Sequence, residues 1–260
     1  MCYYQKYIRL TLIFLSVFHL VAAQKHQKIT KIKYKLYLNT ESPRTKEASL
    51  LINENLTQSL FYEINENYED KILEDDGKIK IQLGSKSTKF NYTDFTKNKL
   101  ISGEQVFSKG VNVLETRPTL NWILRDSVKI IGGNTCHLGE TTFRGRNYIA
   151  WYAPELPFKS GPWKFSGLPG LILEIQDESA RYVWKAEKVE NIIGDFQGEV
   201  TRILSFNGRQ LPLKNYVLED KSRFREKILK VLPRGANNLE FKTPRNGKEL
   251  IYEWEVAAED

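Results

Sequence analysis

The side chains that could do chemistry are few, and their spacing limits what they can do. Cys136 and His137 are neighbours in the chain. On a β-strand, neighbouring side chains face opposite sides of the sheet, which argues against a thiol nucleophile paired with an imidazole base. Zinc needs three or four ligands, and these two residues with His26 are too few unless carboxylates join them. The sequence therefore predicts no catalytic residue of this kind, no metal and no cofactor.

Carboxylates offer the catalytic alternative. The sequence contains no serine elbow, no glycine-rich phosphate loop and no HExxH pattern. Glu155, Glu174 and Asp177 could supply the pair of carboxyl groups that a glycosidase uses, although the sequence does not fix the distance between them. A periplasmic hydrolase, peptidase- or glycosidase-like, is therefore the alternative to a non-enzymatic protein.

Aromatic and basic side chains favour binding instead. They gather between residues 144 and 165, and aromatic and arginine side chains dominate the energetics of interfaces. The alternative is that the tryptophans and tyrosines fill the core, where each buries about 150–250 Å². A peptide, a lipid or another protein is the expected ligand, and the predicted binding residues are Arg144, Arg146, Trp151, Tyr152, Trp163, Lys164 and Phe165.

The N-terminus has the three parts of a secretory signal peptide. A basic start is followed by the apolar run Leu10–Leu20 and by the small residues Val21-Ala22-Ala23 at the cleavage positions. The apolar run is shorter than the ~20 residues that cross a membrane; a buried N-terminal helix is the alternative. We expect residues 1–23 to be removed, and the mature chain to be periplasmic or secreted without spanning the membrane.

The charge of the chain is mild. A net charge of +7 falls to +5 (37 basic minus 32 acidic residues) when Lys6 and Arg9 leave with the signal peptide. Nucleic-acid binding needs a clustered basic stripe, whereas here basic and acidic residues are interspersed, so we exclude it. Cleavage also removes Cys2, which leaves Cys136 without a disulfide partner. We expect Cys136 to be a small buried residue, with a reactive thiol as the alternative.

Most of the chain shows the period-two alternation of half-buried strands. The alternation is clearest in residues 28–39 and 78–83, and Asp75-Asp76-Gly77 predicts a hairpin turn before the second of these. Thr135–Ala153 is typical of a further hairpin, which turns around Arg144-Gly145-Arg146.

The remaining segments complete the expected fold. We predict a strand pair at residues 189–203, an edge strand at residues 250–256 and one amphipathic helix at Leu218–Leu232, whose apolar residues follow a helical period. The sequence thus predicts a single, mainly β domain over residues 24–260. Its expected form is a curved antiparallel sheet or half-barrel meander, which we expect to wrap round that C-terminal helix.

The stretch Gly161–Ile175 contains three glycines and two prolines, which break regular backbone structure, next to an apolar run. Trp163 and Phe165 are expected to point to one side of the backbone and Lys164 to the other. Residues 168–171 fit a type II turn, in which the proline sets φ at the second position and the glycine takes a positive φ at the third. The residues expected to shape this motif are Gly161, Pro162, Gly167, Leu168, Pro169 and Gly170.

The run from Cys136 to Ile175 closely resembles the GLPGLI family, named for residues that stand here as Gly167 to Ile172. The cysteine, the FRGR turn, the AWY segment, the GP pair and the GLPG run are all present. The resemblance implies an exported, β-rich protein with no established reaction, often found with outer-membrane TonB-dependent transport systems. It implies an outer-membrane transporter or another envelope protein as the partner. Residues 241–260 depart from the family pattern, and we expect them to form a variable tail.

Overall fold

The computed structural model describes residues 27–64, 71–75, 78–82, 89–106, 109–231 and 245–256. The expected signal peptide and His26 lie outside the described residues. So do Asp76 and Gly77, although the strands on either side of them, β4 (Lys71–Asp75) and β5 (Lys78–Gln82), pair as the predicted hairpin.

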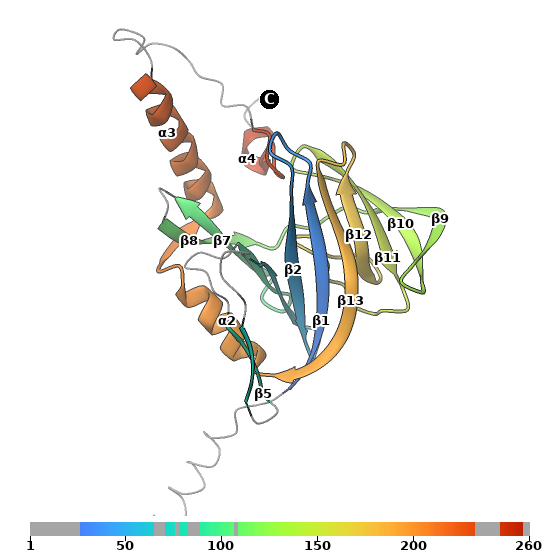
Figure 1. The fold of residues 1–260 in the computed structure, drawn as a ribbon. Helices are drawn as coiled ribbons and strands as arrows, with labels where there is room; N and C mark the ends of the chain where they lie inside the picture. The colour runs from blue at the N-terminus through green and yellow to red at the C-terminus, as the bar shows by residue number, and fades with distance from the viewer. Residues whose placement is uncertain are drawn as a thin grey trace, which may run out of the picture.

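One large curved sheet dominates the molecule (Figure 1). Twelve strands pair in the order β14-β8-β7-β6-β3-β2-β1-β13-β12-β11-β10-β9, and β14 and β9 are its open edges. Among the described residues every ladder of this sheet is antiparallel except that between β14 and β8. The expected curved antiparallel sheet is confirmed. Its strands are β1 (Gln27–Leu38), β2 (Arg44–Asn53), β3 (Gln58–Glu63), β6 (Phe90–Asp94), β7 (Lys99–Val106), β8 (Lys109–Thr116), β9 (Ile123–Ile131), β10 (Asn134–Phe143), β11 (Arg146–Ala153), β12 (Leu171–Asp177), β13 (Tyr182–Gly194) and β14 (Arg209–Pro212).

Two tight turns set the register of the hairpins that β9, β10 and β11 form. Gly132 and Gly133 join β9 to β10 with φ of +55° and +80°, and Arg144 and Gly145 join β10 to β11 with φ of +46° and +81°. Positive φ at both central positions is the type I′ geometry that matches the twist of paired strands. A positive φ is uncommon for a residue with a side chain, so Arg144 holds a backbone conformation that something else must stabilise.

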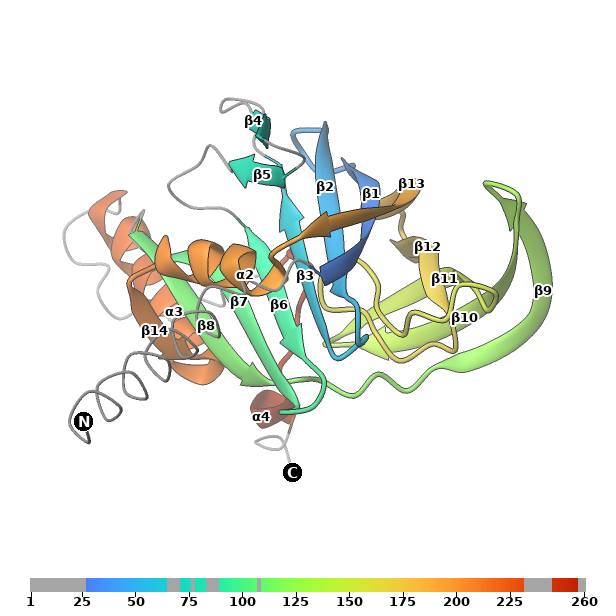
Figure 2. The ribbon, with the colours of Figure 1, turned by 90° about the horizontal axis from the view of Figure 1, so that it is seen from below.

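The core occupies both faces of the sheet. The loop of residues 154–170 lies on the concave face (Figure 2). Side chains from β1, β2, β11, β12 and β13 pack against it there. On the convex face, Phe196, Val200 and Ile203 of helix α2 (Phe196–Ser205) pack against β1, β2, β3, β6 and β7. Because the apolar residues of β1–β3 alternate between these two clusters, the middle of the sheet is buried on both sides.

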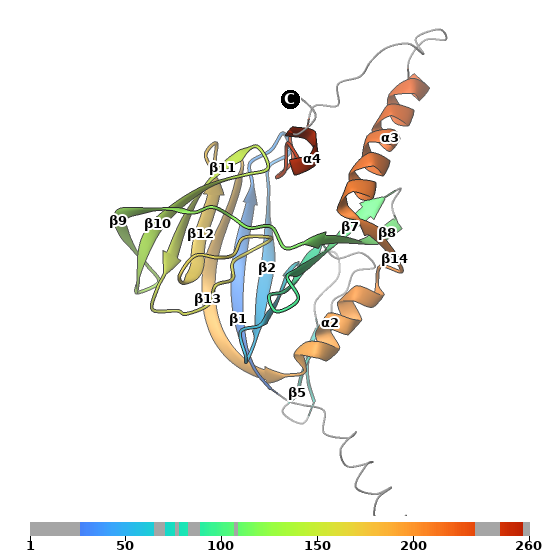
Figure 3. The same cartoon turned by 180° about the vertical axis from the view of Figure 1, so that it is seen from behind.

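The helices depart from the sequence-based expectation. The strand pair predicted at residues 189–203 is wrong: β13 ends at Gly194, Asp195 caps α2 by accepting a hydrogen bond from the Gly198 amide, and the chain continues as helix. The predicted C-terminal helix exists as α3 (Leu213–Val231), but it packs at the β14–β8–β7 end of the sheet rather than inside its curve (Figure 3). No helix in the described part of the chain is long and apolar enough to cross a membrane.

The C-terminal segment of residues 245–256, here called the strap, returns across the concave face (Figure 3). Its last residues form the short helix α4 (Glu253–Val256), so the predicted edge strand at residues 250–256 is wrong. Tyr252 is buried against Val217 of α3 and the β8 side of the sheet, whereas Leu250 and Ile251 donate backbone hydrogen bonds to the Arg144 carbonyl. The strap therefore connects the two ends of the curved sheet.

Candidate functional site

The backbone of the loop of residues 154–170 requires glycine at two positions, 167 and 170. Gly167 has a φ of +99°, which favours glycine. Gly170 does not have the positive φ of the predicted type II turn, and that prediction is wrong. Glycine is required there for a different reason: a Cβ at Gly170 would lie 2.3 Å from the Ala153 carbonyl oxygen. The loop thus runs directly against the end of β11.

An aromatic cluster lies beneath this loop on the concave face. Trp163 stacks on Trp184 of β13 with ring centroids 6.1 Å apart and an interplanar angle of 11°. Phe165 meets both indoles edge-on, at 5.1 and 5.6 Å. Trp163 itself has a φ of +55°, which is a true outlier for a bulky residue. Such strain gathers at functional sites, where the surrounding structure holds it in place.

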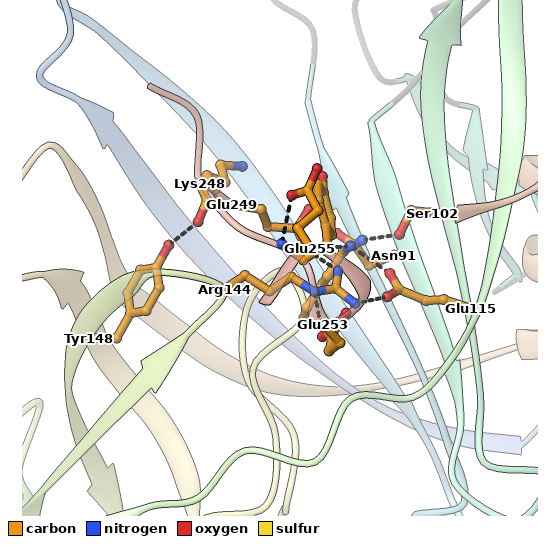
Figure 4. A network of polar contacts seen from close by, with 11 residues as sticks. Asn91, Ser102, Glu115, Arg144, Tyr148, Lys248, Glu249, Glu253 and Glu255 are labelled. Atoms are coloured by element: carbon orange, nitrogen blue, oxygen red, sulfur yellow. Dashed lines mark hydrogen bonds and ion pairs between the residues drawn. The ribbon is translucent and has the colours of Figure 1, made fainter. Parts of the chain in front are cut away.

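Four buried charges form a network, here called the ion cluster: Glu115, Arg144, Lys164 and Glu249. Arg144 also pairs, at 3.0 Å, with the exposed Glu253; Figure 4 shows Arg144 between Glu115, Glu249 and Glu253. Glu115 of β8 accepts hydrogen bonds at 2.6 Å from both Arg144 Nη2 and Lys164 Nζ. Glu249 of the strap accepts from the same two cations, at 2.9 Å from Lys164. Each carboxylate therefore accepts hydrogen bonds from both cations. The network joins β8, the β10–β11 turn, the loop of residues 154–170 and the strap.

Electrostatics within the ion cluster favour the charged forms. Burial alone would lower the pKa of Lys164, but Glu249 and Glu115 outweigh it and raise that pKa. Burial would likewise raise the pKa of Glu249, but Lys164 and Arg144 hold it below its usual range. The same partners offset the cost of the positive φ at Arg144, so the turn and the network stabilise each other.

The strap is bound through its main chain. Three donors on the concave face reach three successive carbonyl oxygens: those of residues 246, 247 and 248. Arg146 donates to the first two, at 3.1 and 2.6 Å. The Tyr182 hydroxyl donates to the first at 3.0 Å, and the Tyr148 hydroxyl donates to the third at 2.8 Å. Arg146 is fixed in turn by Asp177 at 3.0 Å. Side chains of the sheet thus bind the main chain of the strap, which bends at residues 247 and 248.

Lys248 inserts its side chain among aromatic rings and a carboxylate, here called the cation pocket (Glu63, Trp163 and Trp184). Its Nζ lies 5.5 Å from the Trp163 ring centroid, 5.2 Å from that of Trp184 and 3.4 Å from Glu63 Oε1. Glu63 also accepts a 2.7 Å hydrogen bond from Lys46. Burial lowers the pKa of the Lys248 ammonium, and the nearby Glu63 offsets only part of that effect.

A cleft of about 340 Å³ opens beside the cation pocket. Glu63, Trp163 and Tyr182 lie on its wall, with Lys248 and Glu249 of the strap. The cations Arg44, Lys46 and Lys89, the carboxylate of Glu104 and the rings of Phe90, Tyr216 and Tyr252 also line it. The lining carries charges of both signs next to aromatic faces.

The structure places the predicted binding residues as follows. Tyr152, Trp163, Lys164 and Phe165 are buried, and the guanidinium groups of Arg144 and Arg146 are held by carboxylates. Trp151 lies half-buried beneath Lys129. These seven residues do not share one open surface. Of the seven, Trp163 lines the cleft, and a binding role for the others stays a prediction.

The candidate catalytic residues do not converge. Glu174 and Asp177 point to opposite faces of β12, where Glu174 pairs with Lys129 and Asp177 is 1% exposed and binds Arg146 and Ser179. Glu155 is exposed in the loop. Cys136 is buried, and burial raises the pKa of its thiol. Within the described ranges, three or more potential metal ligands do not cluster anywhere.

Four key members of the site escaped sequence analysis: Glu63, Trp184, Lys248 and Glu249. Glu63 and the two strap residues are distant in sequence from the motif at residues 161–175, and the two strap residues lie in what the family pattern marked as a variable tail. The available signal was the alternation that places Trp184 on the same face as Tyr182.

Comparison with known proteins gives a family likeness over one short stretch and a similar fold, but no activity. A family model described as "Protein of unknown function (Porph_ging)" matches residues 137–174, which overlap the residues that carry the GLPGLI resemblance. No curated protein matches the chain.

Two solved structures of PNGF-II, in space groups C2 and P21, are similar to this chain, with TM-scores of 0.53 and 0.51. Sequence identity is 14% in both; the match covers 74% of this chain and 32% and 33% of those chains. The present chain therefore spans about a third of the PNGF-II chains, and the likeness extends to the fold alone.

Proposed function

We propose that this chain is an exported, non-enzymatic binding protein that takes a peptide segment of a partner along its concave face. One observation carries the proposal: Arg146, Tyr148 and Tyr182 already bind three successive main-chain carbonyls of the strap. Donors that reach consecutive carbonyls suit a peptide that can take the bent shape of this part of the strap. Main-chain bonds then give affinity, while pockets for side chains give specificity.

The lining of the cleft favours a peptide over a lipid. An acyl chain would need an apolar cavity, whereas this cleft presents Lys46, Lys89, Glu63 and Glu104. Charged groups buried against hydrocarbon without partners are costly. A peptide supplies amide groups and charges of either sign, which match this lining.

The carboxylates of the site do not favour the hydrolase alternative. Burial would raise the pKa of Glu63, but Lys248 and Lys46 together outweigh it and bring that pKa to about 2. Glu249 is also held below its usual pKa by Lys164 and Arg144. A general acid that works near neutral pH needs a raised pKa, so both carboxylates suit ion pairing better than proton transfer.

The role at the cell envelope rests on the sequence resemblance. The signal-peptide pattern supports export, and the GLPGLI resemblance supports an accessory role beside a TonB-dependent outer-membrane transport system. A peptide-binding face is compatible with that role, because a plug, loop or terminus of a transporter would present a peptide segment.

The test is retention of a synthetic library of acetylated, amidated octapeptides on the immobilised mature chain, read by mass spectrometry. We expect a discrete set of peptides to be retained. The double variant Tyr148→Phe with Tyr182→Phe keeps both rings and removes two of the donors, so it should retain each of them about tenfold less well.

Tyr37→Phe is the matched control, because Tyr37 lies on β1 away from the strap and should not change retention. If no peptide is retained, or if the double variant retains the same peptides equally well, the concave face is not a peptide site.

A further inference from the structure

The cation pocket has the composition of a site for an ammonium group. Two stacked indoles and one carboxylate surround Lys248 Nζ, with both ring centroids within 5.5 Å. Tryptophan is the aromatic side chain that attracts cations most strongly. An aromatic wall with one anion selects a cation with an apolar stem, which describes lysine.

The pocket is held in this shape independently of Lys248. The strained backbone of Trp163 is fixed by contacts of its ring with Phe143, Tyr148, Phe165 and Trp184. Trp184 is fully buried in β13. The two indoles would therefore keep their places if the ammonium left.

Lys248 is held less tightly than the cations of the ion cluster. Its single carboxylate contact is 3.4 Å long, and its side chain is 18% exposed, compared with 3% for Lys164. Glu63 also has a 2.7 Å bond to Lys46, which does not involve Lys248. Withdrawal of Lys248 would therefore leave no unpaired carboxylate behind, and the cleft beside the pocket gives room for a replacement.

We infer that the pocket of Glu63, Trp163 and Trp184 recognises a lysine side chain of the partner peptide, and that Lys248 of the strap occupies it in exchange with that ligand. The inference rests on the proposed peptide binding and adds its specificity. The strap is then an internal substitute for the ligand, presenting a lysine side chain and successive carbonyls to the donors that would hold the partner.

Competition between Lys248 and an added peptide for the cation pocket determines how tightly the peptide binds. A ligand in the same chain acts at an effective concentration in the millimolar range, so an added peptide binds the intact protein weakly. Removal of the Lys248 side chain should relieve that competition at the pocket without removing the pocket itself.

The experiment is titration calorimetry with two probes: the peptide acetyl-Asn-Gly-Lys-Glu-amide, which copies residues 246–249, and the same peptide with norleucine in place of lysine. Lys248→Ala should bind the lysine peptide about tenfold more tightly than the wild type does. It should also prefer that peptide to the norleucine peptide by about tenfold, as expected for one desolvated cation–aromatic contact.

Lys248→Met is the matched control, because its uncharged chain fills the pocket; it should gain no affinity for the lysine peptide. The added substitution Glu63→Gln should weaken the preference for lysine, because it removes the carboxylate and leaves the two indoles in place. If Lys248→Ala is poorly folded, the wild type titrated with both peptides gives the same preference at lower affinity.

The outcomes separate the two proposals. Equal binding of the lysine and norleucine peptides overturns the lysine pocket while leaving peptide binding in place. Binding of neither peptide to any of these proteins overturns both.

Discussion

Consecutive residues of the strap reach into two different charged clusters. Glu249 completes the ion cluster, in which two carboxylates and two cations are all mutually paired and their side chains are 3–14% exposed. Lys248 enters the cation pocket, where one carboxylate is shared between two lysines that are 18% and 29% exposed. In the ion cluster, the loss of any of the four members leaves a buried charge with fewer partners. In the cation pocket, Glu63 has Lys46 as a second partner if Lys248 departs. The ion cluster is therefore a structural element that fixes the strap, whereas the cation pocket is a site where Lys248 can be exchanged for a ligand.

The largest predicted effect is on the ion cluster. Arg144→Ala leaves Glu115 and Glu249 with one cation between them, and breaking a buried ionic network of this kind destabilises by about 3–5 kcal/mol. The free energy of unfolding from urea denaturation checks this value. Arg125→Ala is the control, because its pair with Glu140 is exposed and contributes under about 1 kcal/mol. An Arg144→Ala variant as stable as the control would show that the guanidinium is dispensable.

The second largest predicted effect is the loss, in acid, of the stability that Glu63 contributes through its ion pairs in the cation pocket. Glu63 has a pKa of about 2 in the folded protein against 4.5 for the free side chain, so its contribution is present above pH ~4.5 and is lost as the pH falls toward 2. That difference corresponds to about 3 kcal/mol. The gap in unfolding free energy between the wild type and Glu63→Gln should therefore shrink between pH 6 and pH 2.5. A gap that is independent of pH would contradict the pairing of Glu63 with Lys46 and Lys248.

Gly170→Ala should have an intermediate effect, because its Cβ would overlap backbone atoms rather than a side chain that can move. We expect a loss of about 2 kcal/mol, measured by thermal unfolding. Gly208→Ala is the control: nothing lies within 4 Å of its added Cβ, and its φ is not positive. Equal melting temperatures for the two variants would argue against the close approach of the loop to β11.

Lys248→Ala should have the smallest effect on stability, about 1 kcal/mol or less, since Glu63 keeps Lys46 and the indoles keep their stacking. A loss as large as that of Arg144→Ala would place Lys248 among the structural cations. In that case the strap would be a fixed element, and the exchange with a ligand would not occur.

The sequence predicted the sheet better than the site. Period-two alternation in β1 reflects which side chains face the core, so it can be read residue by residue. Helix α2 was missed although Phe196, Val200 and Ile203 follow a helical period and Asp195 is a good cap; the glycines at 194 and 198 and the β-branched residues concealed it.

The two clusters could not be predicted because they depend on tertiary contacts. Arg144 meets Glu249 across 105 residues, and Lys248 meets Glu63 across 185. Neither spacing leaves a local pattern. The pair of arginines in the FRGR turn suggested an exposed binding surface, whereas the structure directs both inward to hold the strap.

The most direct test of this difference is the rate of lysine acylation at pH 8.5, followed residue by residue by mass spectrometry. Because burial lowers the pKa of Lys248 while Glu249 and Glu115 raise that of Lys164, we predict that Lys248 reacts well before Lys164. The acetyl-Asn-Gly-Lys-Glu-amide peptide should accelerate acylation of Lys248 further by displacing it, and the norleucine peptide should not. Equal rates at the two lysines, or a rate at Lys248 that neither peptide changes, would contradict the account of an exchangeable lysine pocket.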